Sequence, residues 1–313
     1  MDVLKTLFKQ PYWVIALVFG VFLVVFPSTT VDKDYHWATH APTTLLPVVI
    51  GIALLLLSVA AFGFTLISKH KVTSNDLSGI DAERVSECDG AFCTNVNGCE
   101  IHVVNGRIEE YQYAKGAAVV LPCNEYFDDR CAGDTRSALG AFVNRAFEGQ
   151  ATAFVELVRQ ECRKKFGAGC EQQKTDMELA PSFGAGRCVL ILKPLGRAMP
   201  VALVSTTTQR AGQGLAARIS YLFDGMRELF CHLADERINE VAMPILGSGH
   251  GQIDTPLAFV GLVLAIAEAA RYGQGGQRPK RVTIIVFKKD THTLPQVDPV
   301  VIRRALALVG SKN

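Results

Sequence analysis

Apolar residues are unevenly distributed along this 313-residue chain, and the two densest runs lie near its N-terminus. No charged residue occurs between Leu45 and Ile67. A helix of about 23 residues is roughly 34 Å long, enough to cross a hydrocarbon core of about 30 Å. A shorter run, Pro11 to Phe26, reaches spanning length with the residues before it, because the ammonium groups of Lys5 and Lys9 can extend to the interface. The pattern predicts two transmembrane helices, at about residues 8–27 and 45–67.

The charges around these two runs predict their orientation. The connection Ser28–Thr44 contains one lysine against Asp32 and Asp34, whereas several lysines flank the outer ends of the hairpin. The positive-inside rule then places both termini in the cytoplasm, which makes the chain a multi-pass protein of the inner (cell) membrane. An alternative is that Met1 to about Phe26 is a secretory signal, although no small-x-small cleavage site follows it.

After a transmembrane hairpin in residues 1–68, residues 69–99 are polar and form a predicted linker, and residues 100–313 form a predicted α/β domain. Strand-like and helix-like patterns alternate in that domain, which favours an α/β/α sandwich with a mixed central sheet. The predicted strands are Ile101–Val104, Ala117–Leu121, Cys188–Leu192, Val201–Ser205, Val241–Leu246 and Arg281–Lys288. The predicted helices are Thr135–Phe147, Ala151–Lys165, Leu215–Ala234, Pro256–Ala270 and one beginning at Asp298-Pro299. Helix Pro256–Ala270 is apolar nearly all round but short for a third span, so we expect it to be deeply buried.

Composition narrows the classes of ligand. The formal net charge is +2 and no basic stripe stands out, which argues against nucleic-acid binding.

The nine cysteines belong to a chain whose C-terminal domain is predicted to lie in the cytoplasm, so they are expected to be reduced thiols. Cys88, Cys93 and Cys99 cluster near His102, but their spacing is not that of a zinc knuckle, so we predict no metal and no cofactor.

The strongest candidate for a binding site is the loop Gly247-Ser248-Gly249-His250-Gly251, between an apolar strand and a helix. Its glycines let the backbone approach a ligand closely and turn N–H groups toward it. The helix behind the loop begins near Asp254 with Pro256 in its first turn, and its N-terminus adds partial positive charge suited to a phosphate. A tight strand-to-helix connection with no ligand is the alternative.

Two further turns are predicted to meet this loop. The strand Val119–Leu121 ends in the polar turn Pro122–Glu125, and Ala132–Ser137 leads into the next helix. Ligands of open α/β sheets bind beyond the carboxyl ends of the strands, and a helix N-terminus leaves free N–H groups there. Together these features predict a cradle for a diphosphate.

This order of motifs resembles the macro domain, the ADP-ribose-binding module, over roughly Glu100–Leu308. The resemblance matches Leu121–Asn124 with the family's Asn-Ala-Ala-Asn turn and implies that Asn124 faces the distal ribose. It matches Gly133-Asp134 with the first phosphate loop and Gly247–Gly251 with the second. Asn105–Ile108 aligns with the family's Gly-Asp-Ile segment, whose Asp reads adenine. Arg107 departs from that pattern, because a guanidinium cannot accept a hydrogen bond.

A macro domain behind two spans resembles, more narrowly, the membrane-anchored effectors of type II Thoeris anti-phage systems, and Leu121–Asp129 is the stretch most similar to that subgroup. This resemblance implies a messenger derived from ADP-ribose, a histidine conjugate made by a TIR-domain synthase. It further implies homo-oligomerisation, contact with membrane lipid, membrane disruption and abortive infection. The implied ligand-binding residues are Arg107, Ile108, Pro122, Cys123, Asn124, Glu125, Tyr126, Gly133, Asp134, Thr135, Ser137, Leu246, Gly247, Ser248, Gly249, His250 and Gly251.

Two other functions fit the same motifs. An ADP-ribosyl hydrolase would use Asn124 to position the ribose and Asp134 or His250 to activate water. A membrane scaffold would dock on ADP-ribosylated proteins without turnover. We expect a ligand sensor with no catalytic residue, since a hairpin has no evident role in a hydrolase. For the hairpin itself, a passive anchor and an active pore-former both remain open, because no G-x-x-x-G pair marks a packing face.

Overall fold

The structure is a computed structural model of the chain, and it divides into two units, Met1–Ser78 and Gly79–Asn313. It describes residues 29–31, 37–39, 50, 52–53, 84–88, 90–128, 130–212, 214–249, 251–272, 278–288 and 295–311. In the first unit, β1 (Thr29–Val31) pairs antiparallel with β2 (Trp37–Thr39). The two predicted membrane spans lie almost wholly outside the described residues.

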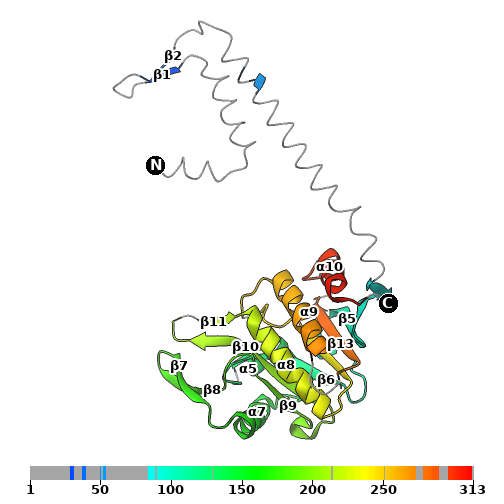
Figure 1. Ribbon diagram of the computed structural model, residues 1–313. Coiled ribbons are helices and arrows are strands. Elements are labelled where there is room, and N and C mark those ends of the chain that lie inside the picture. The colour runs from blue at the N-terminus through cyan, green and yellow to red at the C-terminus, as the bar shows by residue number, and fades with distance from the viewer. Residues whose placement is uncertain are drawn as a thin grey trace. The chain divides into compact units, whose positions relative to one another are not determined.

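A nine-stranded mixed sheet forms the centre of the second unit, in the order β11-β10-β6-β12-β13-β5-β4-β3, with β9 also paired to β10 (Figure 1). Strands β10, β6, β12, β13 and β5 run parallel to one another, and β9, β11, β4 and β3 are antiparallel to their neighbours. The strands are β3 (Ser86–Cys88), β4 (Ala91–Val96), β5 (Cys99–Gly106), β6 (Ala118–Asn124), β9 (Cys188–Ile191), β10 (Val201–Arg210), β11 (Gly214–Ala217), β12 (Glu240–Pro244) and β13 (Arg281–Phe287).

Helices cover both faces of this sheet, which confirms the predicted mixed α/β sandwich. One face packs against α8 (Ile219–Asp235), α9 (Thr255–Tyr272) and α10 (Pro299–Val309). The other packs against α6 (Ala138–Ala146), α7 (Ala151–Phe166) and the short η1 (Ile108–Glu110). The remaining elements are α5 (Arg130–Gly133), η2 (Pro194–Gly196) and a separate hairpin of β7 (Cys170–Thr175) and β8 (Glu178–Ser182).

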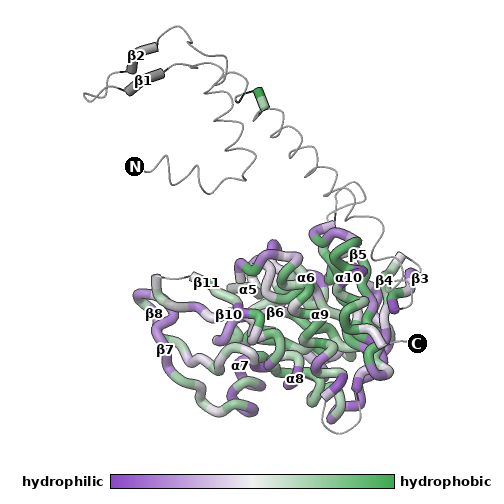
Figure 2. The backbone as a smooth tube through the Cα atoms, turned by 45° about the horizontal axis from the view of Figure 1, so that its top comes forward, coloured by the Kyte–Doolittle hydropathy of each residue, from purple (hydrophilic) through white to green (hydrophobic). Residues whose placement is uncertain are grey.

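The strands are almost continuously apolar because both of their faces are buried. Along β6, Ala118 and Val120 belong to the core beneath α8 and α9, whereas Val119 and Leu121 belong to the core beneath α6 and α7. Side chains of a strand alternate between faces, so an uninterrupted apolar run supplies two cores at once. Figure 2 shows the hydrophobic residues concentrated in the central strands and α9, with hydrophilic stretches along the β7–β8 hairpin.

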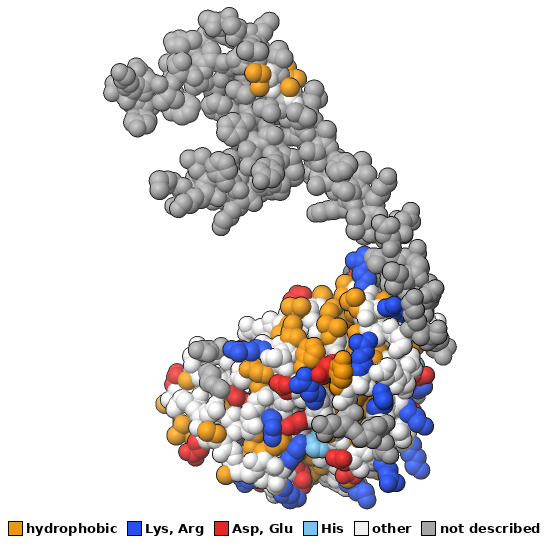
Figure 3. Space-filling view, in the orientation of Figure 1, with side chains coloured by type: hydrophobic (Ala, Val, Ile, Leu, Met, Phe, Trp, Pro, Cys, Tyr) orange, Lys and Arg blue, Asp and Glu red, His pale blue; other side chains and the backbone are white. Residues whose placement is uncertain are grey.

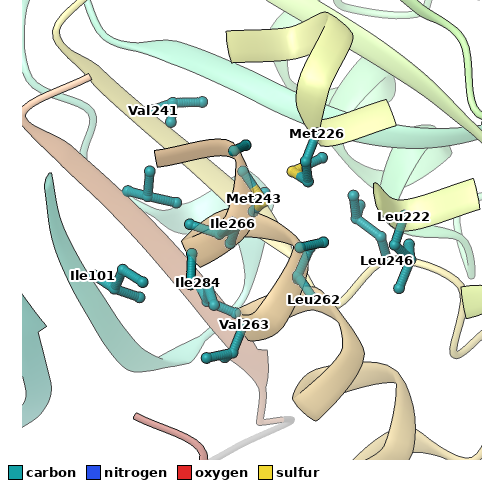
Figure 4. Packing of buried hydrophobic residues seen from close by; sticks show 14 of the residues in the cluster. Ile101, Leu222, Met226, Val241, Met243, Leu246, Leu262, Val263, Ile266 and Ile284 are labelled. Carbon is teal, nitrogen blue, oxygen red and sulfur yellow. The ribbon is translucent and has the colours of Figure 1, made fainter. Parts of the chain in front are cut away.

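Helix α9 lies in the larger core, as its composition predicted. Leu262, Val263 and Ile266 are fully buried and lie beside Met243 of β12 and Ile284 of β13 (Figure 4). Within the described residues, α9 is the one helix long and apolar enough to cross a membrane, and more than half of it is buried inside the domain. Burial by α8, α10 and the sheet accounts for its apolar composition. Hydrophobic side chains nevertheless gather on the face shown in Figure 3. Leu257 and Leu264 of α9 are exposed.

Two sequence-based boundaries were wrong. Residues 86–96, assigned to a polar linker, form β3 and β4, which extend the sheet beyond β5. Their burial does not alternate, since β4 has the consecutive buried residues Cys93 and Thr94 and β3 begins with the exposed Ser86 and Glu87, so no period-2 pattern marks them in the sequence. Helix α8 begins at Ile219 rather than Leu215, because residues 214–217 pair with β10 as the edge strand β11.

Candidate functional site

A cavity of about 530 Å³ lies at the carboxyl ends of the parallel strands. Residues at the ends of β5, β6, β12 and β13 form its floor, together with Thr206 and Thr207 of β10. The lining residues are Gly106, Arg107, Ile108, Glu109, Pro122, Cys123, Thr135, Arg136, Ser137, Ala138, Leu139, Ala141, Thr206, Thr207, Leu215, Pro244, Ile245, Gly247, Ser248, Gly249, Gly251, Ile285, Phe287 and Gln296. Its volume is that of a typical small-molecule site.

The first turn of α6 forms one wall of the cavity. Ser137 is the N-cap residue, and its Oγ accepts a hydrogen bond from the Gly140 N–H at 2.9 Å. The side chain of Asp134 precedes this cap and accepts from the Arg136 N–H at 3.0 Å, which closes the turn that leads into the helix. The cap fixes the direction of α6, so that its positive end belongs to the cavity wall.

Gly247, Ser248, Gly249 and Gly251 form another wall of the cavity, and these four residues are called the open loop below. Gly247 has φ +84°, a conformation that favours glycine. A Cβ on Gly251 would lie 2.6 Å from Ala217 Cβ and 2.7 Å from the Gly247 carbonyl oxygen, so only glycine fits there. A Cβ on Gly249 would meet nothing within 4 Å. The open loop is therefore packed at both ends and has room for a side chain at Gly249.

The two walls present unpaired backbone donors to the cavity. The N–H groups of Ala138 and Leu139 in α6, and of Ser248 and Gly249 in the open loop, donate to no acceptor within the described part of the chain. All of these residues line the cavity. Such donors at a helix N-terminus and a glycine loop are the groups that bind phosphate. The sequence pointed to the N-termini of both α6 and α9; residues of α6 line the cavity, and no residue of α9 does.

The charged side chains of the lining are paired with one another or with near neighbours. Arg107 donates to Glu109, with Nε 2.7 Å and Nη2 2.6 Å from the same oxygen, Oε1. This hydrogen bond raises the pKa of Arg107. Arg136 pairs with Asp134 through Nε and Nη2, at 2.9 and 3.0 Å. Both guanidinium groups are thus already paired. The cavity therefore offers an anion mainly the backbone N–H donors and the partial positive charge at the N-terminus of α6.

The turn at residues 124–128, called the filled turn below, follows β6 and is closed by its own side chains. Asn124 Nδ2 donates to Asp128 Oδ1 at 2.9 Å, and Asn124 Oδ1 accepts from the Tyr126 N–H at 3.0 Å. Glu125 accepts from Ser182 Oγ and from the Gln209 N–H, both at 3.0 Å. Asn124, Glu125 and Asp128 are each at most 5% exposed. Both ends of the Asn124 amide are thus engaged inside the turn.

A buried lysine from the β7–β8 hairpin completes the filled turn. The ammonium of Lys174 pairs with Asp128 and lies 5.6 Å from the centre of the Tyr126 ring. The side chains of Lys174 and Asp128 are only 4% and 3% exposed. Lys174 also pairs with Glu178 at 3.2 Å, across the hairpin. The hairpin therefore holds the loop after β6.

The structure gathers most, but not all, of the predicted ligand-binding residues around the cavity. Those in its lining are Arg107, Ile108, Pro122, Cys123, Thr135, Ser137, Gly247, Ser248, Gly249 and Gly251. Those outside its lining are Asn124, Glu125, Tyr126, Gly133, Asp134 and Leu246. His250 falls outside the described residues. Asn124 turns away because its amide bonds within the filled turn, and Asp134 because it pairs with Arg136.

Several lining residues were missed by the sequence reasoning. Glu109 follows directly after Ile108, and Phe287 is the last residue of a strand that was correctly predicted. Phe287 pairs in register with Gly106 of β5, which brings both segments to the cavity. The rule that ligands bind at carboxyl strand ends could have identified Phe287. Thr206 lies in, and Thr207 directly after, a register shift in β10 that the sequence does not reveal.

No group of three or more His, Cys, Asp or Glu among the described residues is arranged to hold a metal ion. Burial raises the pKa of the Cys99 thiol to about 12. Because zinc binds the thiolate, that burial disfavours Cys99 as a ligand. His102 instead pairs with Glu100 at 3.2 Å.

Comparison with known proteins gives matches among solved structures only; no protein-family model and no curated protein matches the chain. A macrodomain of Oceanobacillus iheyensis with ADP is 10% identical, with a TM-score of 0.44, covering 64% of this chain and 89% of that one. The macrodomain of Thermus aquaticus DarG is 20% identical, with a TM-score of 0.38, covering 60% and 98%. A Trypanosoma brucei macrodomain in complex with ADP-ribose is 13% identical, with a TM-score of 0.40, covering 67% and 69%.

Proposed function

We propose that the second unit is a macro-type domain that binds a nucleotide derived from ADP-ribose in the cavity at the carboxyl edge of its sheet. The observation that supports this most strongly is the pair of donor-rich walls, the first turn of α6 and the open loop, with N–H groups that lack acceptors within the described chain. Two walls of this kind suit a diphosphate, because each can bind one phosphate. The resemblance of the motifs in the sequence supports ADP-ribose as the nucleotide.

Binding rather than hydrolysis is the function favoured by the side chains of the lining. Glu109 is the one carboxylate in the described lining, and it accepts two contacts from Arg107. A general base must reach the attacking water with a free acceptor, and the candidate Asp134 is outside the lining and bonded to Arg136. A sensor needs no such group.

We propose further that this domain controls an N-terminal membrane hairpin, as the resemblance to the Thoeris effectors implies. The uncharged segment from Leu45 to Ile67 supports a membrane span. On this proposal both termini are cytoplasmic, and a messenger made by a TIR-domain synthase favours a homo-oligomer. Rearranged hairpins then disrupt the membrane and abort infection. The messenger acts as a switch only to the extent that it binds the assembled state more tightly.

The test of binding is calorimetric titration of the full-length chain, purified in a mild detergent, with ADP-ribose and with its histidine conjugate. Binding of the conjugate in strong preference to ADP-ribose supports the messenger-gated effector. Equal binding of both favours a scaffold or a hydrolase, and turnover of an ADP-ribosylated protein then distinguishes these two. Absence of binding for both nucleotides contradicts the proposal.

The test of the membrane role uses the same chain in vesicles loaded with a self-quenched dye. Adding the binding nucleotide is expected to release the dye, and the variant Gly249→Glu, which blocks the cavity, is expected to retain it. The matched control Ala153→Glu adds the same charge at an exposed position of α7 and should release dye normally. Binding with no release would leave the hairpin as a passive anchor.

A further inference from the structure

Helices α9 and α10 present apolar side chains on the side that faces away from the sheet. In α9 the exposed Leu257 and Leu264 lie at positions i and i+7, and in α10 the exposed Val300 and Leu308 lie at i and i+8, so each pair shares one side of its helix. Both helices cover the same face of the sheet, and hydrophobic side chains gather over them in Figure 3. These four residues are called the outer surface below.

Arginines border the outer surface where α9 and α10 end. Arg271 and Arg84 donate to carbonyl oxygens of the last turn of α10, at 2.9 and 3.3 Å. Arg303, on the exposed side of α10, pairs with Glu87 at 3.1 Å. In α9, Glu268 is already paired with an arginine of α8. Three guanidinium groups with one carboxylate paired among them leave an excess of positive charge at this end of the outer surface.

The chain enters the second unit at this same end. The Arg84 carbonyl oxygen accepts from Thr94 Oγ1 at 2.7 Å, and a Cβ on Gly310 would lie 3.2 Å from that carbonyl oxygen. Arg84 is therefore packed against the carboxyl end of α10. The uncharged segment that ends at Ile67 lies seventeen positions earlier in the sequence, a length of chain that reaches about 60 Å at most. A membrane span there keeps the arginine-bordered end of α10 near the bilayer.

We propose that the outer surface docks on an anionic lipid surface, that of the membrane in which the chain is anchored. This inference rests on the proposed membrane hairpin and deepens it, because it assigns the side of the domain that contacts lipid. Exposed apolar side chains of such a surface insert at the boundary between headgroups and acyl chains, and basic residues beside them attract anionic headgroups. Each guanidinium has five N–H donors, so those bonded to carbonyl oxygens keep others for lipid phosphates.

The test places a tryptophan on the outer surface of the full-length chain, reconstituted in vesicles whose lipids carry bromine on their acyl chains. The two native tryptophans are first removed by Trp13→Phe and Trp37→Phe. Leu308→Trp then reports contact with lipid, because bromine quenches an indole only at short range. Leu308 is 70% exposed, so the larger ring needs no room in the core. The matched control is Met177→Trp, at a position of the β7–β8 hairpin that is 98% exposed.

Leu308→Trp is expected to be quenched at least about threefold more strongly than Met177→Trp, since only the outer surface inserts among the lipids. The quenching should be stronger in vesicles that contain phosphatidylserine than in phosphatidylcholine alone, because the arginines bind anionic headgroups. Val300→Trp, on the same side of α10, is a second reporter if Leu308→Trp fails to fold.

Quenching no stronger than that of the control overturns the inference. Unquenched emission that is shifted to the blue indicates that protein, such as a second copy of the chain, covers the outer surface, and unquenched emission as in water indicates that the surface is free. Equal quenching in the two kinds of vesicle overturns the role of the arginines. Release of the whole chain from the vesicles by alkaline carbonate contradicts the proposed hairpin itself, whereas an inserted chain with an unquenched Leu308→Trp contradicts this inference alone.

Discussion

The filled turn and the open loop follow neighbouring parallel strands of one sheet, yet one is closed by its own side chains and the other is hollow. In the filled turn, Asn124 bonds to Asp128 and Asp128 pairs with Lys174, all of them buried. In the open loop, a Cβ added at Gly249 would have no neighbour within 4 Å, and the N–H groups of Ser248 and Gly249 have no acceptor within the described chain.

This difference separates two uses of polar residues at strand ends. Polar side chains that satisfy one another stabilise the chain and leave nothing for a ligand. Backbone donors without partners are costly unless water or a ligand bonds to them, and they therefore mark a binding wall. Substitutions in the filled turn should change stability, and substitutions at Gly249 should change binding.

The largest loss of unfolding free energy is expected for Lys174→Met. Removing the ammonium leaves the Asp128 charge buried and uncompensated, which costs about 3–5 kcal/mol of unfolding free energy. Denaturant unfolding followed by circular dichroism measures it. The double variant Lys174→Met/Asp128→Asn removes both charges and should recover part of the loss. A loss below about 0.5 kcal/mol in the single variant, the range of an ordinary surface substitution, would contradict the filled-turn account.

A smaller effect is expected for Gly251→Ala, which tests the packed end of the open loop. The new Cβ would lie 2.6 Å from Ala217 Cβ and 2.9 Å from Thr207 Cγ2, so the loop must shift. Overpacking of this kind costs about 1–3 kcal/mol. Thermal unfolding of Gly251→Ala beside Gly249→Ala measures the contrast, because the second variant has room for its methyl group. Equal melting temperatures would show that the loop is not packed as described.

Ser137→Ala tests the wall that faces the open loop. Loss of the N-cap hydrogen bond to Gly140 is expected to cost about 1 kcal/mol and to weaken nucleotide binding, because the first turn of α6 frays. Calorimetry and denaturant unfolding on the same preparation measure both effects. Ser137→Asp, which retains a capping oxygen, should restore the stability but not the binding, since its charge repels phosphate. Full binding by Ser137→Asp would remove α6 from the phosphate site.

The smallest effect is a pH dependence that belongs to neither region. Burial lowers the pKa of His232, assisted by the Lys165 ammonium and opposed by Glu228 and Asp235. Because the folded-state pKa lies below the unfolded value of about 6.5, the unfolded chain binds the proton more tightly, and stability falls as pH falls through and below that value. His232→Gln should flatten this part of the stability profile and leave nucleotide binding at a pH of about 7.5 unchanged, where the histidine is neutral in both states. Identical profiles of stability against pH for the unsubstituted chain and His232→Gln would contradict the assignment of this pH dependence to His232.

The sequence predicted the sandwich because both of its cores leave a periodic or continuous apolar pattern. The strands 241–246 and 281–288 and the buried helix 256–270 were found within a few residues. The sequence could not show that Asn124 bonds within its own turn, because its partners Asp128 and Lys174 come together only through a distant hairpin. Strand β3 was missed because a three-residue edge strand depends on pairing more than on composition, and β4 because its burial does not alternate. The predicted role of Asn124 at the ribose stays a prediction.

The measurement that tests the central claim most directly is titration of ADP-ribose into the full-length chain and the variants Gly249→Gln, Gly249→Glu and Ala153→Glu. Gly249 lines the cavity and has room for a side chain, and Ala153 is exposed. The unfolding free energy of each variant should therefore lie within about 0.5 kcal/mol of that of the unsubstituted chain. The account predicts weaker binding for Gly249→Gln, where bulk alone intrudes, no detectable binding for Gly249→Glu, where charge also repels the diphosphate, and unchanged binding for Ala153→Glu. Binding of ADP-ribose by Gly249→Glu as tight as by the unsubstituted chain would contradict the claim that this cavity is the nucleotide site.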